Sequence, residues 1–507
     1  MKPRFLLYGV LLALIILPLA ACSANTPAPT AVPTSAPKVA PTNAPTTTPT
    51  TPPTVAPATA TTAPTKEPTK TPVKLPTKEQ PTSAKPTETP GAPDTGLAVV
   101  GYNTFTDASN YFHVSGEVKN NDQRVLTNME LTIIIKDASG KTLLTDTNNK
   151  PVDSVTFSPM LSNLAPGEIS PFDYSLDATA GTPDPKSVSV KVTGMNTGDV
   201  TRANVEVENT QMVASGTDYY LVTGEIANKG GKPVEVHDLA AALVDQDGKV
   251  LAADYSVDYA IDLLPFGDQD NRDLTPFTLT INNPGTEPAD YKIYLDAQET
   301  DLGTTYPVQV DLTNNYFDNS SSFHIVGTVT NQSSETLTVE LVAGLYDKDG
   351  IVLDAYTTSS PVNLAPDEVM PYDISSFSNV NYNSDEAKRL DHFTVQVDDY
   401  FTFPSAIESV PLKSSGDSAE KDDTNAEWTV TGQVTNTSGK ALSSEIVMVQ
   451  VVDTDGKVIA VNYDWISPSG DSIAAGETGS YKVVVPLEPG IDTSSYTVKT
   501  FVKGEVK

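Results

Sequence analysis

The stretch Gly116-Glu117-Val118-Lys119-Asn120 decides the fold, because its pattern of a glycine followed four positions later by an asparagine occurs four times. The other copies begin at Gly224, Gly327 and Gly432, so successive glycines are 108, 103 and 105 residues apart. An aromatic residue stands four positions before each of these glycines: Phe112, Tyr220, Phe323 and Trp428. A regular period of this kind indicates tandem copies of one structural unit of about 100 residues.

Turn motifs recur at matching distances after each glycine. An apolar run ends in an aspartate 20 or 21 residues beyond the glycine, and a turn glycine follows three residues later; these aspartates are Asp137, Asp245, Asp347 and Asp453. Further on, two of the units contain a Leu-Ala-Pro turn and then proline with an aromatic residue, Pro171-Phe172 and Pro371-Tyr372. Apolar and polar residues alternate between the turns, which predicts about seven short strands per unit.

A period-2 pattern of this length needs two sheets that bury one face against each other. The sequence therefore predicts an all-β protein with four tandem immunoglobulin-like β-sandwich modules, after a signal peptide and a disordered Pro/Thr-rich linker. The predicted boundaries are 1–21 for a lipoprotein signal peptide, 22–95 for the linker, and 96–199, 200–304, 305–403 and 404–507 for the four modules.

Cys22 is the only cysteine, and it ends an apolar run that follows Lys2 and Arg4. These features are typical of a secretory signal, and the ending Leu19-Ala20-Ala21-Cys22 resembles a bacterial lipobox. The resemblance implies that the Cys22 thiol is acylated after residues 1–21 are removed. We therefore expect a lipid-anchored protein on the extracellular face of the cell membrane or envelope. The alternatives are an ordinary signal peptide or a transmembrane helix.

Composition separates the linker from the modules. The linker holds 18 of the 40 prolines, which favours extended polyproline II over a compact fold. Eight of the 32 basic and three of the 65 acidic residues precede Asp94, so residues 94–507 carry 24 basic and 62 acidic side chains. Such an acidic surface repels nucleic acid, which we exclude as a partner, and it favours cations or basic partners.

The order Gly-x-Val-x-Asn, an apolar strand ending in Tyr-Asp, and then Asp-Gly resembles the FxLYD-type domain of bacterial and archaeal exported proteins. It also resembles, more loosely, adhesion-related immunoglobulin-like repeats. The third unit matches best, with Leu345-Tyr346-Asp347, although Ala343 stands where the signature phenylalanine belongs. The resemblance implies a β-sandwich module without established catalysis.

Catalytic motifs are missing from the sequence. His113 and His324 share one repeat position, but Leu221 and Thr429 take it in the other units, so we predict that these histidines lie on an exposed strand face. The chain contains no Gly-x-Ser-x-Gly, His-Glu-x-x-His or Walker motif. We therefore expect that the protein is not an enzyme, that it has no catalytic residues and that it needs no cofactor.

The Asp-x-Asp-Gly turns are the sharpest candidates for a bound ion, because paired carboxylates suit Ca²⁺. Their candidate ligands are Asp245, Asp247, Asp347, Asp349, Asp453 and Asp455. A hairpin turn, in which aspartate accepts bonds from backbone amides, explains the same pattern, and we favour it. Two further acidic clusters, Asp268–Asp273 and Asp398-Asp399, are interpreted as solvated loops rather than ion sites.

Trp465 fits either a core position, which we favour, or a surface ring for stacking on a glycan. We expect the membrane, through the lipid anchor, to be one partner, and a cell-wall glycan or a surface protein to be another. The predicted function is a membrane-anchored surface lipoprotein that presents its modules for adhesion, for protein or glycan binding, or as a spacer. The alternative is a solute- or glycan-binding component that delivers its ligand to a transporter or a surface hydrolase.

Overall fold

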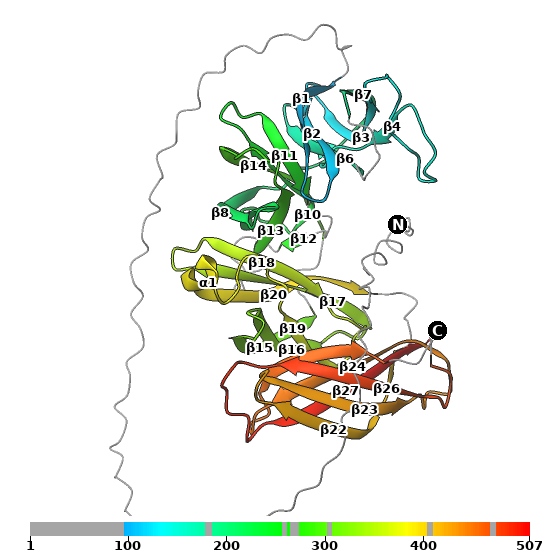
Figure 1. The fold of residues 1–507 in the computed structure, drawn as a ribbon, viewed down its shortest axis with the longest axis vertical. Helices are drawn as coiled ribbons and strands as arrows, with labels where there is room; N and C mark the ends of the chain where they lie inside the picture. The colour runs from blue at the N-terminus through cyan, green and yellow to red at the C-terminus, as the bar shows by residue number, and fades with distance from the viewer. Residues whose placement is uncertain are drawn as a thin grey trace, which may run out of the picture. The chain divides into compact units, whose positions relative to one another are not determined.

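The structure is a computed structural model of the whole chain, and it describes residues 96–177, 185–255, 261–263, 273–301, 307–402, 409–466 and 473–506. Contacts divide the chain after Thr87, and all described residues belong to the second unit, Glu88–Lys507. The predicted signal peptide, Cys22 and the predicted linker lie outside the described residues. Within those residues the chain is almost entirely β, with one short helix, α1 (Asp385–Arg389) (Figure 1).

The strands fall into four groups, here called modules 1 to 4, and this confirms the predicted all-β class with tandem β-sandwich modules. Module 1 contains β1 (Leu97–Thr106), β2 (Tyr111–Asn120), β3 (Val125–Lys136), β4 (Val155–Phe157), β5 (Asn163–Leu164), β6 (Ile169–Asp177) and β7 (Ser187–Gly198). Module 2 contains β8 (Val205–Ser215), β9 (Tyr219–Asn228), β10 (Val234–Val244), β11 (Val250–Tyr255), β12 (Ile261–Leu263), β13 (Leu274–Asn282) and β14 (Asp290–Glu299).

Modules 3 and 4 repeat this order. Module 3 contains β15 (Val308–Phe317), β16 (Phe323–Asn331), β17 (Leu337–Asp347), β18 (Val352–Ser359), β19 (Val369–Ile374) and β20 (Leu390–Thr402), with α1 before β20. Module 4 contains β21 (Ser409–Pro411), β22 (Ser414–Asp422), β23 (Glu427–Thr435), β24 (Leu442–Val452), β25 (Val458–Trp465), β26 (Thr478–Pro486) and β27 (Thr497–Val506).

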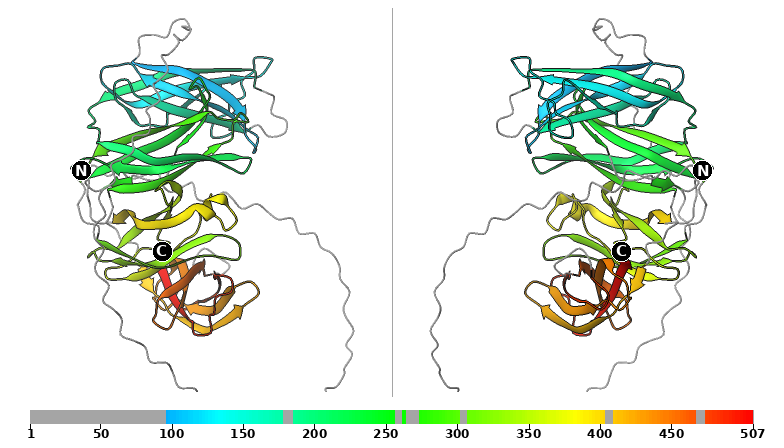
Figure 2. Two further views of the ribbon diagram at one scale, coloured as in Figure 1. Left: turned by 90° about the vertical axis from the view of Figure 1, so that its left-hand side faces the viewer. Right: turned by 90° about the vertical axis from the view of Figure 1, so that its right-hand side faces the viewer.

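Every module pairs two antiparallel sheets, and the first sheet has the same strand order in all four modules. The first sheet has the strand order β1-β2-β6 in module 1, and the corresponding sheets are β8-β9-β13, β15-β16-β19 and β22-β23-β26. The second sheet is built around β3, β10, β17 or β24, each paired on one side with the closing strand of its module. Figure 2 shows the strands of module 1, in blue and cyan, from two opposite sides.

The repeated glycine is needed because an aromatic ring lies over it. Gly116 is directly opposite Phe172 in the first sheet, and the other pairs are Gly224 with Phe277, Gly327 with Tyr372, and Gly432 with Tyr481. A Cβ at Gly116 would lie 2.6 Å from the Phe172 ring, and one at Gly432 would lie 2.5 Å from the Tyr481 hydroxyl. Only a residue without a side chain leaves room for the ring.

The repeated asparagine is buried, and its side chain bonds the backbone of two separate turns. Asn120 donates from Nδ2 to the Arg124 oxygen at 2.9 Å and to the Leu164 oxygen at 2.8 Å, and its Oδ1 accepts from the Asp122 amide at 2.7 Å. Asn331 makes the equivalent bonds in module 3. This side chain satisfies backbone groups that the strand ends leave open, which is the role of an asparagine in a turn.

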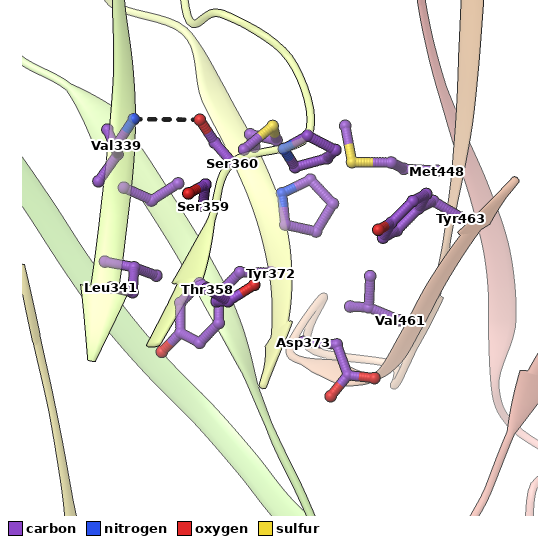
Figure 3. A pocket seen from close by; sticks show the side chains of 14 residues that line it. Val339, Leu341, Thr358, Ser359, Ser360, Tyr372, Asp373, Met448, Val461 and Tyr463 are labelled. Atoms are coloured by element: carbon purple, nitrogen blue, oxygen red, sulfur yellow. Dashed lines mark hydrogen bonds between the residues drawn. The ribbon is translucent and has the colours of Figure 1, made fainter. Parts of the chain in front are cut away.

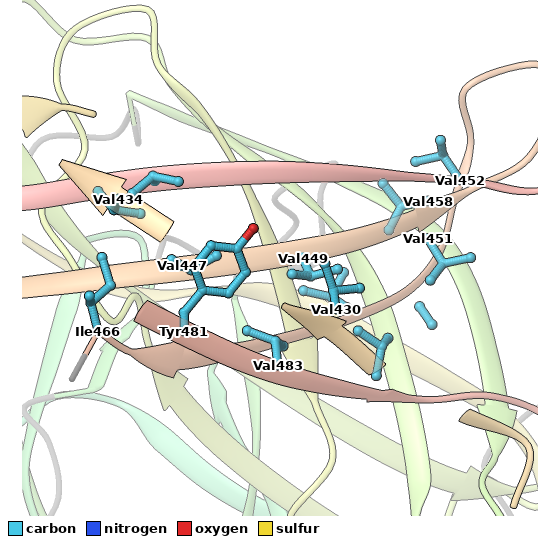
Figure 4. Packing of buried hydrophobic residues seen from close by; sticks show 14 of the residues in the cluster. Val430, Val434, Val447, Val449, Val451, Val452, Val458, Ile466, Tyr481 and Val483 are labelled. Carbon is cyan, nitrogen blue, oxygen red and sulfur yellow. The ribbon is translucent and has the colours of Figure 1, made fainter. Parts of the chain in front are cut away.

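Aliphatic side chains from both sheets fill each module. In module 4, Val447, Val449 and Val451 of β24 face Val430, Val483 and Tyr481 of the first sheet (Figure 4). These residues are 5% exposed or less, so burial of apolar surface stabilises the module without any disulfide.

Candidate functional site

The outer face of the first sheet, which points away from the core of its own module, is the most distinctive surface of the repeat. In modules 1 to 3 this face is covered by the second sheet of the following module. β3 of module 1 alternates between buried and exposed residues, whereas β10 is buried at every position from Leu239 to Val244. Ala241 and Leu243 pack in the core of module 2, and Ala240 and Ala242 pack against module 1. A strand buried on both faces loses its alternation.

Polar side chains connect modules 1 and 2 across this contact. Glu117 on the outer face of β2 is 7% exposed. Its Oε1 accepts from the Lys292 ammonium at 2.9 Å and from the Tyr294 hydroxyl at 2.6 Å, both on β14. The Asn103 side chain donates to the Leu251 oxygen at 3.0 Å. Because the buried carboxylate is both paired and hydrogen-bonded, removing either partner is expected to weaken the junction.

The junction between modules 2 and 3 repeats this arrangement. Glu225, one residue after the strand glycine like Glu117, accepts from the Tyr346 hydroxyl at 2.9 Å. The Thr223 hydroxyl donates to the Val352 oxygen at 2.6 Å, and Thr278 donates to the Asp354 carboxylate at 3.1 Å. Tyr346 belongs to the Leu-Tyr-Asp stretch, so the tyrosine of that motif contacts the neighbouring module.

Modules 3 and 4 meet through a more aromatic contact. The Tyr316 hydroxyl donates to the Pro486 oxygen at 3.0 Å, and the Asn314 side chain donates to the Ile459 oxygen at 2.9 Å. A small cavity of about 40 Å³ lies at this junction, where Tyr463 and Val461 of module 4 face Asp373 of module 3 (Figure 3). A cavity of this size has room for little more than a water molecule.

The two histidines lie at these junctions, and the prediction that they are exposed is wrong. His113 is 6% exposed and His324 is 4% exposed. They are on the outer face of the sheet as the alternation implied, but the next module covers that face. The sequence pattern identifies the face of a strand, whereas the contact that buries it comes from residues far along the chain.

Each histidine is held between two aspartates and one aromatic ring. His113 Nδ1 lies 2.9 Å from Asp173 Oδ2, its Nε2 lies 3.3 Å from Asp107 Oδ2, and its ring stacks on Phe105 at 4.6 Å. Burial acts to lower the pKa of His113, but the hydrogen bonds and charges of Asp173 and Asp107 outweigh it and raise the pKa. The Ser115 hydroxyl bonds Asp173 rather than the imidazole, so it lacks the base contact of a catalytic serine.

His324 has the same surroundings in module 3. Its Nδ1 lies 2.8 Å from Asp373 Oδ2 and its Nε2 lies 3.4 Å from Asp318 Oδ2, while the ring stacks on Tyr316 at 4.7 Å. Burial lowers the pKa of His324, and the two aspartates raise it further than burial lowers it. In both sites the neighbouring aspartates thus favour the protonated form of the imidazole.

The Asp-x-Asp-Gly turns have the geometry of tight hairpins. Asp245 Oδ1 accepts from the amides of Asp247 and Lys249, both at 2.9 Å, and Gly248 has a φ of 76°. Asp347 and Asp453 repeat these bonds, and the second aspartates Asp247, Asp349 and Asp455 are exposed. Asp137 makes the same turn with Ser139 in the second position. The turn thus forms without a second carboxylate, which supports the hairpin interpretation, while the Ca²⁺ site stays a prediction.

The interpretation of Asp398-Asp399 as a solvated loop is wrong. Both residues lie in β20, and Asp398 is 2% exposed. Burial, with the charges of Glu340 and Asp399, raises the pKa of Asp398 to about 8, and burial raises that of Asp399 to about 7.

The other acidic cluster, residues 268–273, lies outside the described residues except for buried Asp273. Among the described residues, no group of three or more histidines, cysteines, aspartates or glutamates is placed to hold a metal ion.

Trp465 is 46% exposed, so the favoured core position is wrong. It lies near the end of β25, two residues beyond Tyr463, which is 47% exposed. Residues two apart in a strand share a face, and these two rings are paired in register with Ile446 and Met448, which pack against module 3. The edge of the junction therefore carries two exposed aromatic rings.

No other described module covers the outer face of module 4, and this face is polar. The positions of His113, Ser115 and Glu117 are taken by Thr429, Thr431 and Gln433, which are partly or fully exposed. Ser480 and Lys482 of β26 are exposed on the same sheet.

No helix in the described part of the chain is long and apolar enough to cross a membrane.

Comparison with known proteins gives no family. No family model and no curated protein matches the chain. Similar solved structures include red sea bream transglutaminase, at 14% identity over 39% of this chain with a TM-score of 0.14, and E. coli alpha-2-macroglobulin, at 10% identity over 80% with a TM-score of 0.12. A Bacteroides uniformis beta-glucuronidase 2 matches at 11% identity over 54% with a TM-score of 0.11.

The chain spans 31%, 28% and 29% of these three structures, respectively. At such scores the likenesses carry no conclusion about function.

Proposed function

We propose that this chain is a lipid-anchored surface protein without catalytic activity, whose modules form a connected spacer that presents the outer face of module 4. The observation that supports the proposal most directly is the difference between the four outer faces. Three are buried against a following module, and the fourth is polar and open. An outer face that stays in contact with water is polar for solubility, as in the capping units of repeat proteins, whereas a face covered by a neighbouring unit is buried.

The junctions support a spacer because they are specific contacts rather than flexible connections. Each one combines apolar packing with hydrogen bonds that involve buried side chains, such as those that Lys292 donates to Glu117 and Tyr346 donates to Glu225. Unpaired buried charges are costly, so sliding of one module over the next would break these pairs at a free-energy cost. Such contacts suit a protein that holds its last module at a fixed distance from its anchor.

The absence of catalytic activity remains part of the proposal. The histidines with perturbed pKa values are buried between modules, where each is fixed by two carboxylates. A general base needs access to a substrate proton, which these positions do not offer. The acidic surface of the modules favours a basic or a neutral partner, and a cell-wall glycan or a surface protein fits that description.

The anchor is tested by fractionating cells that express the full chain with Cys22→Ala. We expect this variant to leave the membrane fraction, because the acylated thiol is lost, while the neighbouring control Ser23→Ala stays with the membrane. Retention of the Cys22→Ala variant in the membrane fraction would contradict the lipoprotein proposal and favour a membrane-spanning segment or an uncleaved signal.

A second candidate function, delivery of a solute or glycan to a transporter or surface hydrolase, is favoured by the exposed rings of Trp465 and Tyr463. Aromatic rings on a surface present an apolar platform to the C–H face of a sugar. Binding of a cell-wall glycan that weakens with Trp465→Ala would support this candidate over a pure spacer.

A further inference from the structure

A pocket opens in module 4 between β22 and β27. Its volume is about 360 Å³, and its lining includes Trp428, Val430, Tyr496 and Val498 together with the polar residues Asp417 and Thr500. Ligand pockets of small molecules begin at about 300 Å³. The volume of the pocket is thus at the lower end of the range for small-molecule sites, and it suits a ligand with one small ring rather than an extended chain of several rings.

The pocket exists because the first strand of module 4 lacks apolar side chains. β22 has the sequence Ser-Ser-Gly-Asp-Ser-Ala-Glu-Lys-Asp, and seven of its nine residues are exposed. Two residues after the strand glycine, each module has a core valine or isoleucine that pairs with a residue of the first strand. That partner is a valine in modules 1 to 3 and a serine in module 4. The pairs are Val118–Val99, Ile226–Val207, Val329–Val310 and Val434–Ser414. Apolar side chains that close the other modules at this edge are missing here.

A small residue stands at the rim of this gap. Ala419 is paired with the core residue Val430 and points to the same side, yet it remains exposed. The residues at the same position in modules 1 to 3 are Thr104, Met212 and Asn315. In module 4 the gap is bordered by two large aromatic residues, Trp428 and Tyr496, both partly buried against the core.

The lining also offers hydrogen-bonding groups to a ligand. The Trp428 Nε1 atom is buried and has no hydrogen-bond partner among the described residues. A buried donor without an acceptor is unfavourable by about 1–3 kcal/mol, but this atom is closed to solvent, so the pocket presents the carbon atoms of the Trp428 ring to a ligand. Asp417 is fixed by bonds from Tyr481 at 2.8 Å and Ser414 at 2.6 Å, and a carboxylate retains further acceptor capacity.

We propose that this pocket binds one neutral pyranose unit. The C–H face of the sugar packs on the rings of Trp428 and Tyr496, and a sugar hydroxyl donates to Asp417. The negative charge of Asp417 and of the surrounding surface disfavours anionic sugars. The inference deepens the proposed function, since it gives the displayed module a ligand, and it rests on that function only for its biological setting.

The test uses residues 23–507 carrying Trp465→Phe, so that Trp428 is the only tryptophan. The fluorescence of Trp428 is followed while neutral hexoses and N-acetylhexosamines are added, with glucuronate as the charged comparison. We expect a saturable change with a dissociation constant on the order of 1 mM, as suits a ligand of about a dozen non-hydrogen atoms. Absence of a saturable change with every neutral sugar would overturn the proposal.

Two variants locate the site by ligand-observed NMR, which needs no tryptophan signal. Ala419→Phe fills the pocket from its exposed rim and should weaken binding more than about tenfold, and Trp428→Phe reduces the ring surface under the sugar and should weaken it about fivefold. Tyr219→Phe, exposed in module 2, should leave the affinity unchanged. Unchanged binding in Ala419→Phe would place the ligand elsewhere and overturn the proposal. Because this protein carries no lipid, either result is independent of the Cys22 experiment.

Discussion

Replacing Asp398 by asparagine should stabilise the protein at pH 8. Asp398 is 2% exposed in β20, and burial together with the charges of Glu340 and Asp399 raises its pKa to about 8. An aspartate in the unfolded chain has a pKa near 3.9. The folded state therefore favours the protonated carboxyl, and the free energy of unfolding falls as the pH rises from about 4 to about 8. Asparagine has nearly the same shape and cannot ionise.

The size of the effect follows from the shift of about four pKa units. At about 1.4 kcal/mol per unit, the upper bound on the gain at pH 8 is about 5 kcal/mol, and at pH 5 it falls to about 1.5 kcal/mol. Relaxation around a buried charge reduces such values, so we expect about 2–5 kcal/mol at pH 8. For a module of about 100 residues that unfolds by itself, 2 kcal/mol corresponds to a rise of about 8 °C or more in Tm.

The assay is differential scanning calorimetry of residues 23–507 at pH 4, 5, 6.5 and 8, comparing Asp398→Asn with the parent. The exposed Asp455→Asn serves as a matched control that should leave the transition unchanged at every pH. The reasoning is refuted if Asp398→Asn lowers the transition at pH 8, or if its gain does not shrink as the pH falls. Either result would mean that a cation neutralises Asp398 in the folded state.

Three further predictions concern the repeat and its junctions. Gly327→Ala should lower stability by about 2 kcal/mol or more in thermal unfolding, because the new Cβ would lie 2.6 Å from the Tyr372 hydroxyl; the exposed Ser320→Ala is its control. Tyr346→Phe should lower the unfolding transition by the equivalent of about 1–3 kcal/mol, since Glu225 loses a donor; an unchanged transition would mean that water replaces the hydroxyl. The raised pKa of His324 contributes stability that is fully present below pH 6.5 and lost as the pH rises through the folded pKa; His324→Gln should therefore flatten the fall in Tm between pH 6 and pH 9, and an equally steep fall would contradict the ion-pair assignment.

Several features of the fold could be predicted from sequence because they depend on local rules. The strand glycine, the aromatic residue opposite it and the Asp-Gly hairpins recur with fixed spacing, and each follows from backbone geometry. The burial of β10 on both faces is also visible in the sequence, because Leu239 to Val244 is an uninterrupted apolar run. That run could have indicated that the sheet is covered on both faces.

The candidate site was less predictable, for a physical reason. His113, Asp398 and Trp465 were each assigned the wrong exposure. Exposure on the outer face depends on whether another module covers it, and that contact joins residues about 100 or more positions apart. Periodicity within one strand contains no information about such a contact.

The sequence by itself therefore determined the class of fold, the repeat and the turn chemistry, and it identified Cys22 as the residue to which an anchor is assigned. Only the tertiary structure decided which outer faces are covered, and thus which polar side chains become buried ion pairs. It also revealed the pocket beside Trp428, because an unfilled volume depends on the side chains of two strands at once, and β22 and β27 are more than 70 residues apart in the chain.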